Sequence, residues 1–575
     1  MTQAPVISGL PAGVLDAAGY TPNIAQGSVF VVKGSNLCPA GVVQAGSYPL
    51  PVTLNGVSIA LTPAAGGASV AAYMIYTYNS AGVSQLAAVM PSATTPGLYN
   101  ISVSANGSTS AAVPVTVVQR KFGIFTADSS GTGAAALQSI DATGGYHNNR
   151  FTTGALGGSS GVSMAPAHPG DFLVAYGTGL GAIQVSDQGA PGVIDFSGQT
   201  SIEVLVGGEA ITPLYAGRSP GYSGVDQINL QLPADVQTGC TVPIQVSVAG
   251  QLSNLATVAI APAGGDTCSP APVSTDVLSR LDQGGSLTLG SFWLTQVTPA
   301  ATQPQLAGIG NMNESALGAF VKYSGFQLAG AAALLSAPGA CQISYTVGNT
   351  AQLIFGSIGT YLDAGGLTLS GPGVGVRQLT RDTASGAYSV LLGDSNSPLA
   401  SIHLPLGYPS LTPSPMIASG AYQLTGSGGA DIGKFSASAT VGQPLTISDG
   451  LPAAVNRARD LTISWTGGTS GGLVSVTGIS GTIVGGTSTQ PIYDAAKFTC
   501  TAETSSGSIT IPSALLSQLP VTPTGGAGMG YLAVTSGAQP AQGNGMFTAP
   551  LTAGGAIDGG FFLGTLGTFT TATYQ

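Results

Sequence analysis

The stretch GSVFVVKGSNL at residues 27–37 decides the fold, because it returns as GDFLVAYGTGL at residues 170–180, 143 positions later. Further along, GVSQ at 82–85 returns as GVDQ at 224–227, 142 positions later. A following proline and glycine keep that second offset. Glycines and prolines at matching places specify matching turns. A period this long is typical of a duplicated domain rather than of a solenoid.

The rest of the chain consists of short β-rich runs between turn-forming residues. Residues 244–248, IQVSV, alternate apolar and polar side chains with a period of two, as a strand with one wet face does. Gly, Asn and Pro recur about every ten residues, a spacing typical of sandwiches and barrels. A short helix is expected after a cap at Ser274 or Thr275. We therefore predict an all-β fold of tandem immunoglobulin-like β-sandwiches, the first two related by duplication.

Linker composition sets the expected domain limits. Residues 5–118 form copy one and residues 119–263 form copy two. A Pro- and Gly-rich hinge follows. Residues 274–435 are expected to form a third, β-rich domain, and residues 436–575 a fourth sandwich with Trp465 in a core strand.

Copy two carries motifs that resemble a known family. They are HPGD at 168–171, YGTGL at 176–180, YAG at 215–217, GYSGVDQIN at 221–229 and SN at 253–254. In this order they resemble the uncharacterised C-terminal domain repeated in secreted proteins of Solibacter-type Acidobacteria, which is related in pattern to immunoglobulin-like IPT/TIG modules. Segments of the second half, such as GGADIG at 428–433 and WTGG at 465–468, are similar to segments of such proteins. The resemblance implies secretion and a β-sandwich fold, and it implies no activity.

Charge is scarce. Asp, Glu, Lys and Arg make up 6% of the chain against a usual share of about 25%, and the net charge is −10. Hydrophobic residues reach 43%, which excludes intrinsic disorder. A nucleic-acid partner is excluded because it would require a basic stripe. An uncharged surface suits a harsh extracellular setting; the alternative is a composition bias of the source genome.

No apolar run is long enough for a membrane helix, so no membrane span is expected. The N-terminus shows no signal-peptide pattern, which leaves a removed signal peptide or a cytosolic protein as alternatives. We expect the former, and an extracellular or cell-surface location. Among the cysteines, Cys240 with Cys268 is the first expected disulfide and Cys341 with Cys500 the second, leaving Cys38 alone.

Catalytic and metal sites are not expected. GGSSG at 157–161 matches the hydrolase G-x-S-x-G pattern, with His168 and Asp171 nearby, but it reads as a loop instead of a strand-to-helix elbow. Asp128 and Asp394 could cap turns or hold calcium, yet neither has a calcium loop's set of acids. We predict no catalytic residues, no metal, no cofactor and no enzymatic activity.

Four tyrosines of copy two, Tyr146, Tyr176, Tyr215 and Tyr222, could line a weak ligand-binding face; the alternative is that they are core or corner tyrosines. The leading expectation is a secreted structural or adhesive protein that assembles with itself or other surface proteins into a filament or cell-surface layer through edge strands. The C-terminal run 567–575 is a candidate added strand. The alternative is a module that binds polysaccharide or another partner.

Overall fold

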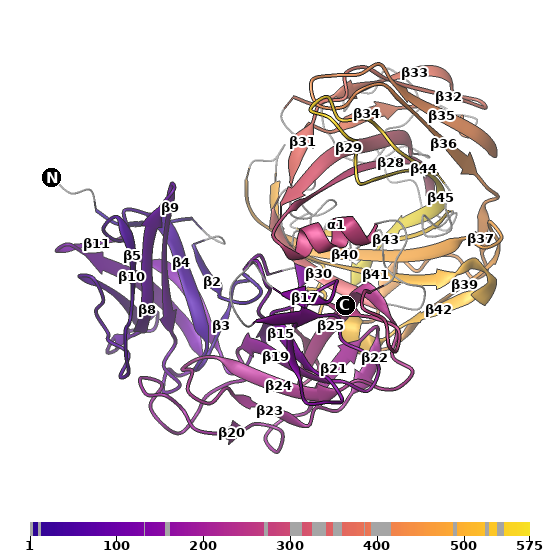
Figure 1. The fold of residues 1–575 in the computed structure, drawn as a ribbon. Helices are drawn as coiled ribbons and strands as arrows, with labels where there is room; N and C mark the ends of the chain where they lie inside the picture. Colours follow the sequence, from indigo (N-terminus) through magenta and orange to yellow (C-terminus); the bar gives the residue numbers. More distant parts are fainter. Residues whose placement is uncertain are drawn as a thin grey trace. The chain divides into compact units, whose positions relative to one another are not determined.

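The computed structural model describes residues 4–9, 13–131, 133–155, 162–268, 274–299, 313–324, 341–348, 359–383, 386–392, 416–486, 491–523, 528–537 and 545–575. Two compact units divide the chain, Met1–Cys268 and Ser269–Gln575. Strands dominate both, so the all-β prediction is confirmed, with immunoglobulin-like sandwiches in the first unit (Figure 1).

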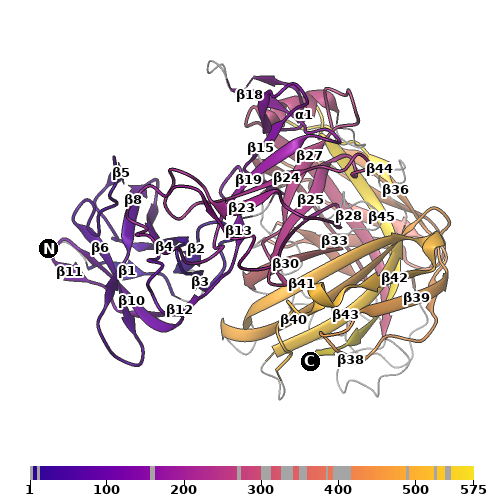
Figure 2. The same cartoon turned by 90° about the horizontal axis from the view of Figure 1, so that it is seen from below.

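Copy one is a sandwich of facing sheets (Figures 1 and 2). Its first sheet has the order β1-β4-β9-β8-β5, with β2 beside β4. These strands are β1 (Val6–Ile7), β2 (Val14–Asp16), β4 (Val29–Ser35), β5 (Gly41–Gln44), β8 (Tyr73–Ser80) and β9 (Val83–Val89). The facing sheet has the order β3-β12-β10-β6-β7, with β11 beside β10. Its strands are β3 (Ile24–Ala25), β6 (Val57–Pro63), β7 (Val70–Ala71), β10 (Gly97–Ala105), β11 (Ser108–Thr109) and β12 (Val113–Val118). Phe30, Ile59 and Leu86 are fully buried between the sheets.

Copy two repeats this plan. Its first sheet has the order β17-β18-β16-β15-β19-β24-β23-β20, with β13 beside β19. The strands are β13 (Gly123–Ile124), β15 (Leu137–Ile140), β16 (Tyr146–Asn149), β17 (Gly154–Ala155), β18 (Ser163–Ala165), β19 (Phe172–Thr178), β20 (Ile194–Asp195), β23 (Tyr215–Arg218) and β24 (Asp226–Gln231). The facing sheet consists of β14 (Gly133–Ala134), β21 (Ile202–Val206), β22 (Glu209–Ile211), β25 (Gly239–Val248), β26 (Gln251–Leu252) and β27 (Ala256–Ile260). Leu173, Val204 and Ile228 belong to the core between them.

The duplication is visible in strand order and in the repeated glycines. The series β4-β9-β8-β5 of copy one matches β19-β24-β23-β20 of copy two. Gly34 and Gly177 lie at matching places, each where a short strand, β1 or β13, pairs with the repeated strand. A Cβ at either glycine would clash with the backbone of that short strand, so both positions require glycine.

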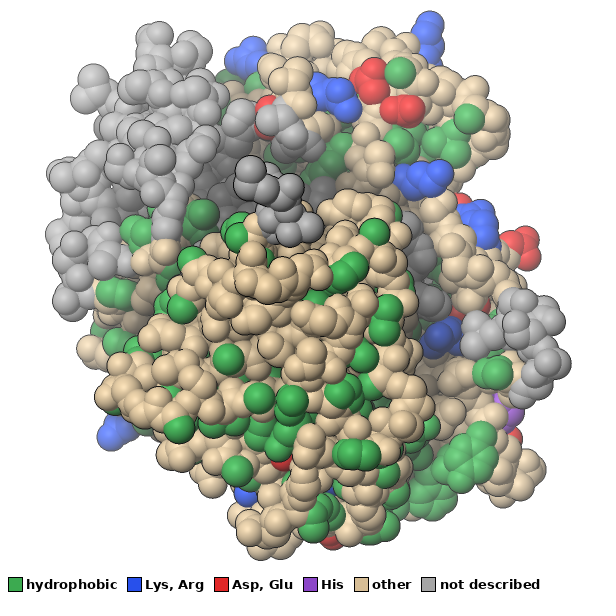
Figure 3. Space-filling model, turned by 90° about the vertical axis from the view of Figure 1, so that its left-hand side faces the viewer, with side chains coloured by type: hydrophobic (Ala, Val, Ile, Leu, Met, Phe, Trp, Pro, Cys, Tyr) green, Lys and Arg blue, Asp and Glu red, His purple; other side chains and the backbone are tan. Residues whose placement is uncertain are grey.

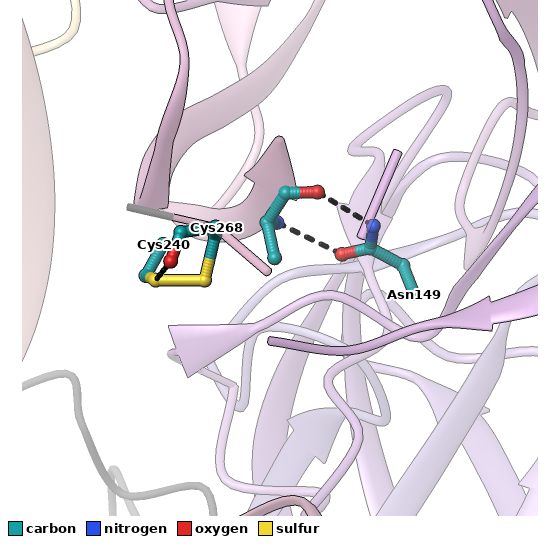
Figure 4. The surroundings of a disulfide bond; sticks show 4 residues. Asn149, Cys240 and Cys268 are labelled. Atoms are coloured by element: carbon teal, nitrogen blue, oxygen red, sulfur yellow. Dashed lines mark hydrogen bonds between the residues drawn. A yellow bond between two sulfur atoms is a disulfide. The ribbon is translucent and has the colours of Figure 1, made fainter. Parts of the chain in front are cut away.

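Both expected cysteine pairs are disulfides in the structure, Cys240–Cys268 and Cys341–Cys500, and Cys38 is free and buried. Near the first bond the amide of Asn149 joins β16 to β27 (Figure 4). It donates to Ala259 O at 2.8 Å and accepts from Ala259 N at 2.9 Å. The bond and this amide pair close the end of the copy-two sandwich where the chain leaves it.

The second unit starts with α1 (Thr275–Asp282), whose N-cap is Ser274, so the predicted helix is confirmed. One large sheet then has the order β30-β41-β40-β43-β45-β28-β29-β34-β33-β32-β35-β36, with β31 beside β29 and β44 beside β45. Its strands are β28 (Ser286–Pro299), β29 (Asn313–Ser324), β30 (Cys341–Gly348), β31 (Thr360–Leu362), β32 (Leu367–Gly371), β33 (Gly375–Arg381), β34 (Tyr388–Leu391), β35 (Gly420–Gly426), β36 (Phe435–Val441), β40 (Leu473–Gly486), β41 (Pro491–Glu503), β43 (Gly528–Gly537), β44 (Met546–Phe547) and β45 (Gly559–Thr571). Strands of the ranges 274–435 and 436–575 thus share one sheet, and the boundary expected between them stays a prediction.

Smaller elements complete the second unit. They are β37 (Leu445–Ile447), β38 (Ala454–Val455), β39 (Leu461–Gly467), η1 (Thr504–Ser506), β42 (Ser508–Ile511), α4 (Ser513–Leu516) and β46 (Thr573–Tyr574). Trp465 is buried in β39, as predicted, and its indole donates to Thr504 O at 2.9 Å. None of the helices in the described ranges has the length and apolar character needed to cross a membrane.

The expectation for the C-terminal run is wrong. β45 lies between β43 and β28 and bonds to both, and β46 pairs with β38. Residues 567–575 are therefore used inside their own chain, and they leave no free strand for addition to another subunit.

Candidate functional site: the outer face of copy two

The strands β16, β15, β19, β24 and β23 lie side by side in the first sheet of copy two (Figure 1). One face of this sheet packs on the core, so alternate side chains point away from it. Residues directly opposite each other on neighbouring strands share a face. Two rows point outward: Tyr146, Ile140, Phe172 and Gln231, and beside them Asn148, Gln138, Val174, Asn229 and Tyr215. Tyr176 opposite Gln227 starts a third.

We call this surface the platform, defined by its aromatic residues Tyr146, Phe172, Tyr176 and Tyr215 and its amides Gln138, Asn148, Gln227, Asn229 and Gln231. Tyr146 is 63% exposed and Phe172 is 40% exposed, which is unusual for large aromatic side chains. Tyr222 of the β23–β24 loop is also 63% exposed, and we count it with the platform because it lies within electrostatic reach of Tyr176. The remaining platform aromatics are half-buried.

Tyr176 interacts electrostatically with two of the other three predicted tyrosines. Burial raises the pKa of Tyr176, and the neighbouring hydroxyls of Tyr222 and Tyr146 raise it further. Tyr176 on β19 is thus within electrostatic reach of Tyr146 on β16 and of Tyr222 in the β23–β24 loop. Tyr176 stays neutral under ordinary conditions and can donate or accept a hydrogen bond.

The fourth, Tyr215, has its hydroxyl in use. It donates to Arg218 O at 2.7 Å and reaches Ile194 O at 3.2 Å. Its ring lies over Gly217, where a Cβ would be 2.5 Å from the tyrosine oxygen. This is the behaviour of a corner tyrosine, the alternative considered for these residues. Its ring edge still belongs to the platform.

The amides are organised by their own contacts. Gln227 Nε2 donates to Asn229 Oδ1 at 2.9 Å, and Gln231 Nε2 donates to Gly170 O at 3.1 Å. The Tyr176 hydroxyl reaches Gln138 Oε1 at 3.4 Å. Each amide retains donor or acceptor capacity beyond these bonds. Sequence reasoning missed the amides and Phe172, although the alternation in β24, DQINLQ, was a readable signal.

All the named platform residues are uncharged. The ion pair of Arg218 with Asp226, on β23 and β24, has both side chains fully buried and so is hidden from a ligand. Burial raises the pKa of Asp226 to about 6, even though Arg218 opposes that rise. The chemistry that the platform offers is therefore aromatic contact and neutral hydrogen bonding.

A Ser–His–Asp array that sequence reasoning missed lies at the β15–β16 hairpin. Asp141 Oδ2 is 2.9 Å from His147 Nε2, and His147 Nδ1 is 2.7 Å from Ser163 Oγ. Asp141 Oδ1 accepts bonds from Thr143 and from Gly145 N inside the turn. Hydrogen bonding, first from His147, holds the pKa of Asp141 well below its ordinary value. The array ties the hairpin turn to β18, which runs beside β16.

The other sequence candidates are placed differently. Residues 157–161, the G-x-S-x-G match, lie outside the described residues, as does Asp394. His168 Nε2 contacts Gly265 O at 2.8 Å, and Asp171 accepts from His168 N, so both residues stabilise a turn. Asp128 accepts from Ser130 N as a turn cap does. Within the described residues no three His, Cys, Asp or Glu side chains gather as a metal site would require.

No protein-family model and no curated protein matches this chain. Among solved structures it is distantly similar to SGBP-B of the Bacteroides ovatus mixed-linkage glucan utilization locus in complex with a mixed-linkage heptasaccharide, at 12% identity and a TM-score of 0.18, over 64% of this chain and 70% of that one. It is also similar to domains 4–9 of the surface layer protein SbsC (9%, TM-score 0.14, 97% and 83%) and to Sidekick-1 immunoglobulin domains 1–4 (9%, TM-score 0.12, 99% and 98%). At these scores the similarities carry no argument about function.

Proposed function

We propose that this chain is an extracellular, non-enzymatic protein that binds a neutral polysaccharide through the platform of copy two. The observation that carries the proposal is that exposed aromatic rings and neutral amides share the outward face of one sheet. Two disulfides support an oxidising, extracellular location.

Sugar rings have one face of C–H groups and a rim of hydroxyls. The exposed rings of Tyr146, Phe172 and Tyr222 supply flat apolar area for such a face. Gln138, Asn148 and Gln227 supply neutral donors and acceptors for the hydroxyls. Apart from Tyr222, these groups stand on strands of one sheet, which holds them at fixed spacings and reduces the ordering cost of binding.

The lack of charge selects the ligand class. An acidic polysaccharide would require cationic partners, whereas the named platform residues carry none. A neutral ligand also gives binding that changes little with ionic strength, because few counterions are displaced.

The test is retention of the full chain by insoluble or gel-embedded polysaccharides at low and at high salt. Neutral glucans, xylan and chitin form one arm, and pectin and alginate form the other. We expect retention by at least one neutral polymer at both salt concentrations and none by the acidic polymers. Retention by acidic polymers alone, abolished by salt, would overturn the proposal.

A further inference from the structure

We propose that β5, at the edge of the first sheet of copy one, pairs with β5 of a second copy of this chain. This inference is independent of the proposed function, because the platform lies in copy two. All four residues of β5 are exposed, including Val42 at 61% and Val43 at 37%. β5 pairs with β8 on one side and is the last strand of the sheet.

The hydrogen bonds of the ladder show which groups face outward. Ala45 N donates to Ile75 O at 2.8 Å, so the hydrogen-bonded pairs with β8 fall at residues 45, 43 and 41. The N–H and C=O of Val42 and Gln44 then point away from β8, toward the open edge. This open edge offers the donors and acceptors of a strand ladder.

The duplication supplies an internal comparison, because β20 of copy two occupies the matching edge. β20 has two residues instead of four, and one of them is Asp195. Ile194 O is contacted by the Tyr215 hydroxyl, and Asp195 accepts from Ser197. A short edge strand that carries a charge and whose polar groups are already bonded is protected from pairing with another chain. β5 lacks each of these protections: it is longer, carries no charged residue, and exposes all four of its residues.

Charge favours a second copy as the occupant. Residues 34–119 contain no Asp, Glu, Lys, Arg or His, although the whole chain carries a net charge of −10. The face drawn in Figure 3 consists mainly of polar uncharged and hydrophobic side chains, with few Lys, Arg, Asp or Glu side chains over its middle. Two copies therefore meet with least repulsion through the region of residues 34–119.

The outward groups also set the register. An antiparallel pair needs Val42 opposite Gln44 of the second copy, so that all outward N–H and C=O groups are matched. Val43 then lies opposite its own counterpart on the two-fold axis. A four-residue ladder is a small interface, which makes the dimer weak and reversible.

The experiment is sedimentation of the full chain from micromolar to near-millimolar concentration. We expect the wild type to dimerise. Val43→Lys and Val43→Glu should each raise the dimer dissociation constant at least about fivefold, because like charges meet on the two-fold axis. An equimolar mixture of the two variants should recover dimerisation. Val193→Lys, an equally simple change at a valine beside the copy-two edge, should behave as wild type.

Circular dichroism of each variant checks that the fold is kept. A wild type that stays monomeric throughout would overturn the proposal. So would Val43 variants that dimerise like wild type, or a mixture that gains nothing over the single variants. Retention on polysaccharide is measured on the same samples, so that a failure of β5 pairing and a failure of platform binding are told apart.

Discussion

Arg218 and Asp226 form an ion pair, 2.7 Å from Nη1 to Oδ1, in which neither side chain is exposed. The pair joins β23 to β24, two of the strands that carry the platform, and its side chains are buried. Arg218 also donates to Gly181 O at 2.8 Å, and a Cβ at Gly27 of copy one would lie 2.8 Å from Arg218 Nη2. The first glycine of the repeated motif is thus the point where copy one accommodates the buried arginine of copy two.

Replacing only one residue of the Arg218–Asp226 pair should destabilise the fold. Arg218→Met leaves the Asp226 carboxylate buried without its counter-charge, and we expect the free energy of unfolding to fall by about 3–5 kcal/mol. Arg218→Met combined with Asp226→Leu should recover most of that loss, because a buried ion pair and an apolar pair of similar size are often close in stability. Urea denaturation of wild type, Arg218→Met, Asp226→Leu and the double variant measures this, and a loss in the double variant equal to the sum of the two single losses would show that the pair does not act as a unit.

Asp226 of the same pair makes the stability of the fold depend on pH. Asp226 has a pKa of about 6 in the folded chain against an ordinary value of 3.8, so the folded state holds the proton more tightly. The stabilisation from this group is complete below about pH 4 and is lost as the pH rises through 6. Unfolding free energies of wild type and Asp226→Asn, compared between these limits, should differ in slope. Parallel curves would contradict the assignment.

The Ser163–His147–Asp141 array should be structural. We expect no labelling of Ser163 by a fluorophosphonate probe and no hydrolysis of simple acyl esters. Asp141→Asn, which weakens the tie across the hairpin, should lower the melting temperature without changing any activity. Ester hydrolysis that disappears in Ser163→Ala would show that the array is catalytic and would end the non-enzymatic proposal.

The sequence predicted those features of the fold that depend on turns and helix caps, because these are specified by residues close together in the chain. The repeat at 27–37 and 170–180 predicted two similar sandwiches, because glycine and proline determine the backbone conformation of the turns in which they occur. The helix after Ser274 followed from its cap for the same reason. Tyr146, Tyr176 and Tyr222 were chosen by residue type alone. Their role in binding stays a prediction, and their positions in the fold could not be derived from the local sequence.

Features that depend on distant pairing could not be predicted in this way. β45 lies parallel to β28, about half the chain away, and no local pattern marks that partner, so the run 567–575 was misread as free. Ser163 reaches His147 only because β18 runs parallel to β16. The amides of the platform needed the register of β15, β19 and β24 before they formed a surface.

The measurement that tests the platform most directly is a calorimetric titration of the full chain with soluble oligosaccharides of the neutral polymer that retains it. Tyr146→Ala and Tyr222→Ala should each weaken binding about tenfold, equivalent to about 1.4 kcal/mol, while Leu98→Ala, which removes another large exposed side chain, this one from copy one, should leave it unchanged. Equal affinity in all four proteins would contradict the account and place any polysaccharide binding elsewhere on the chain.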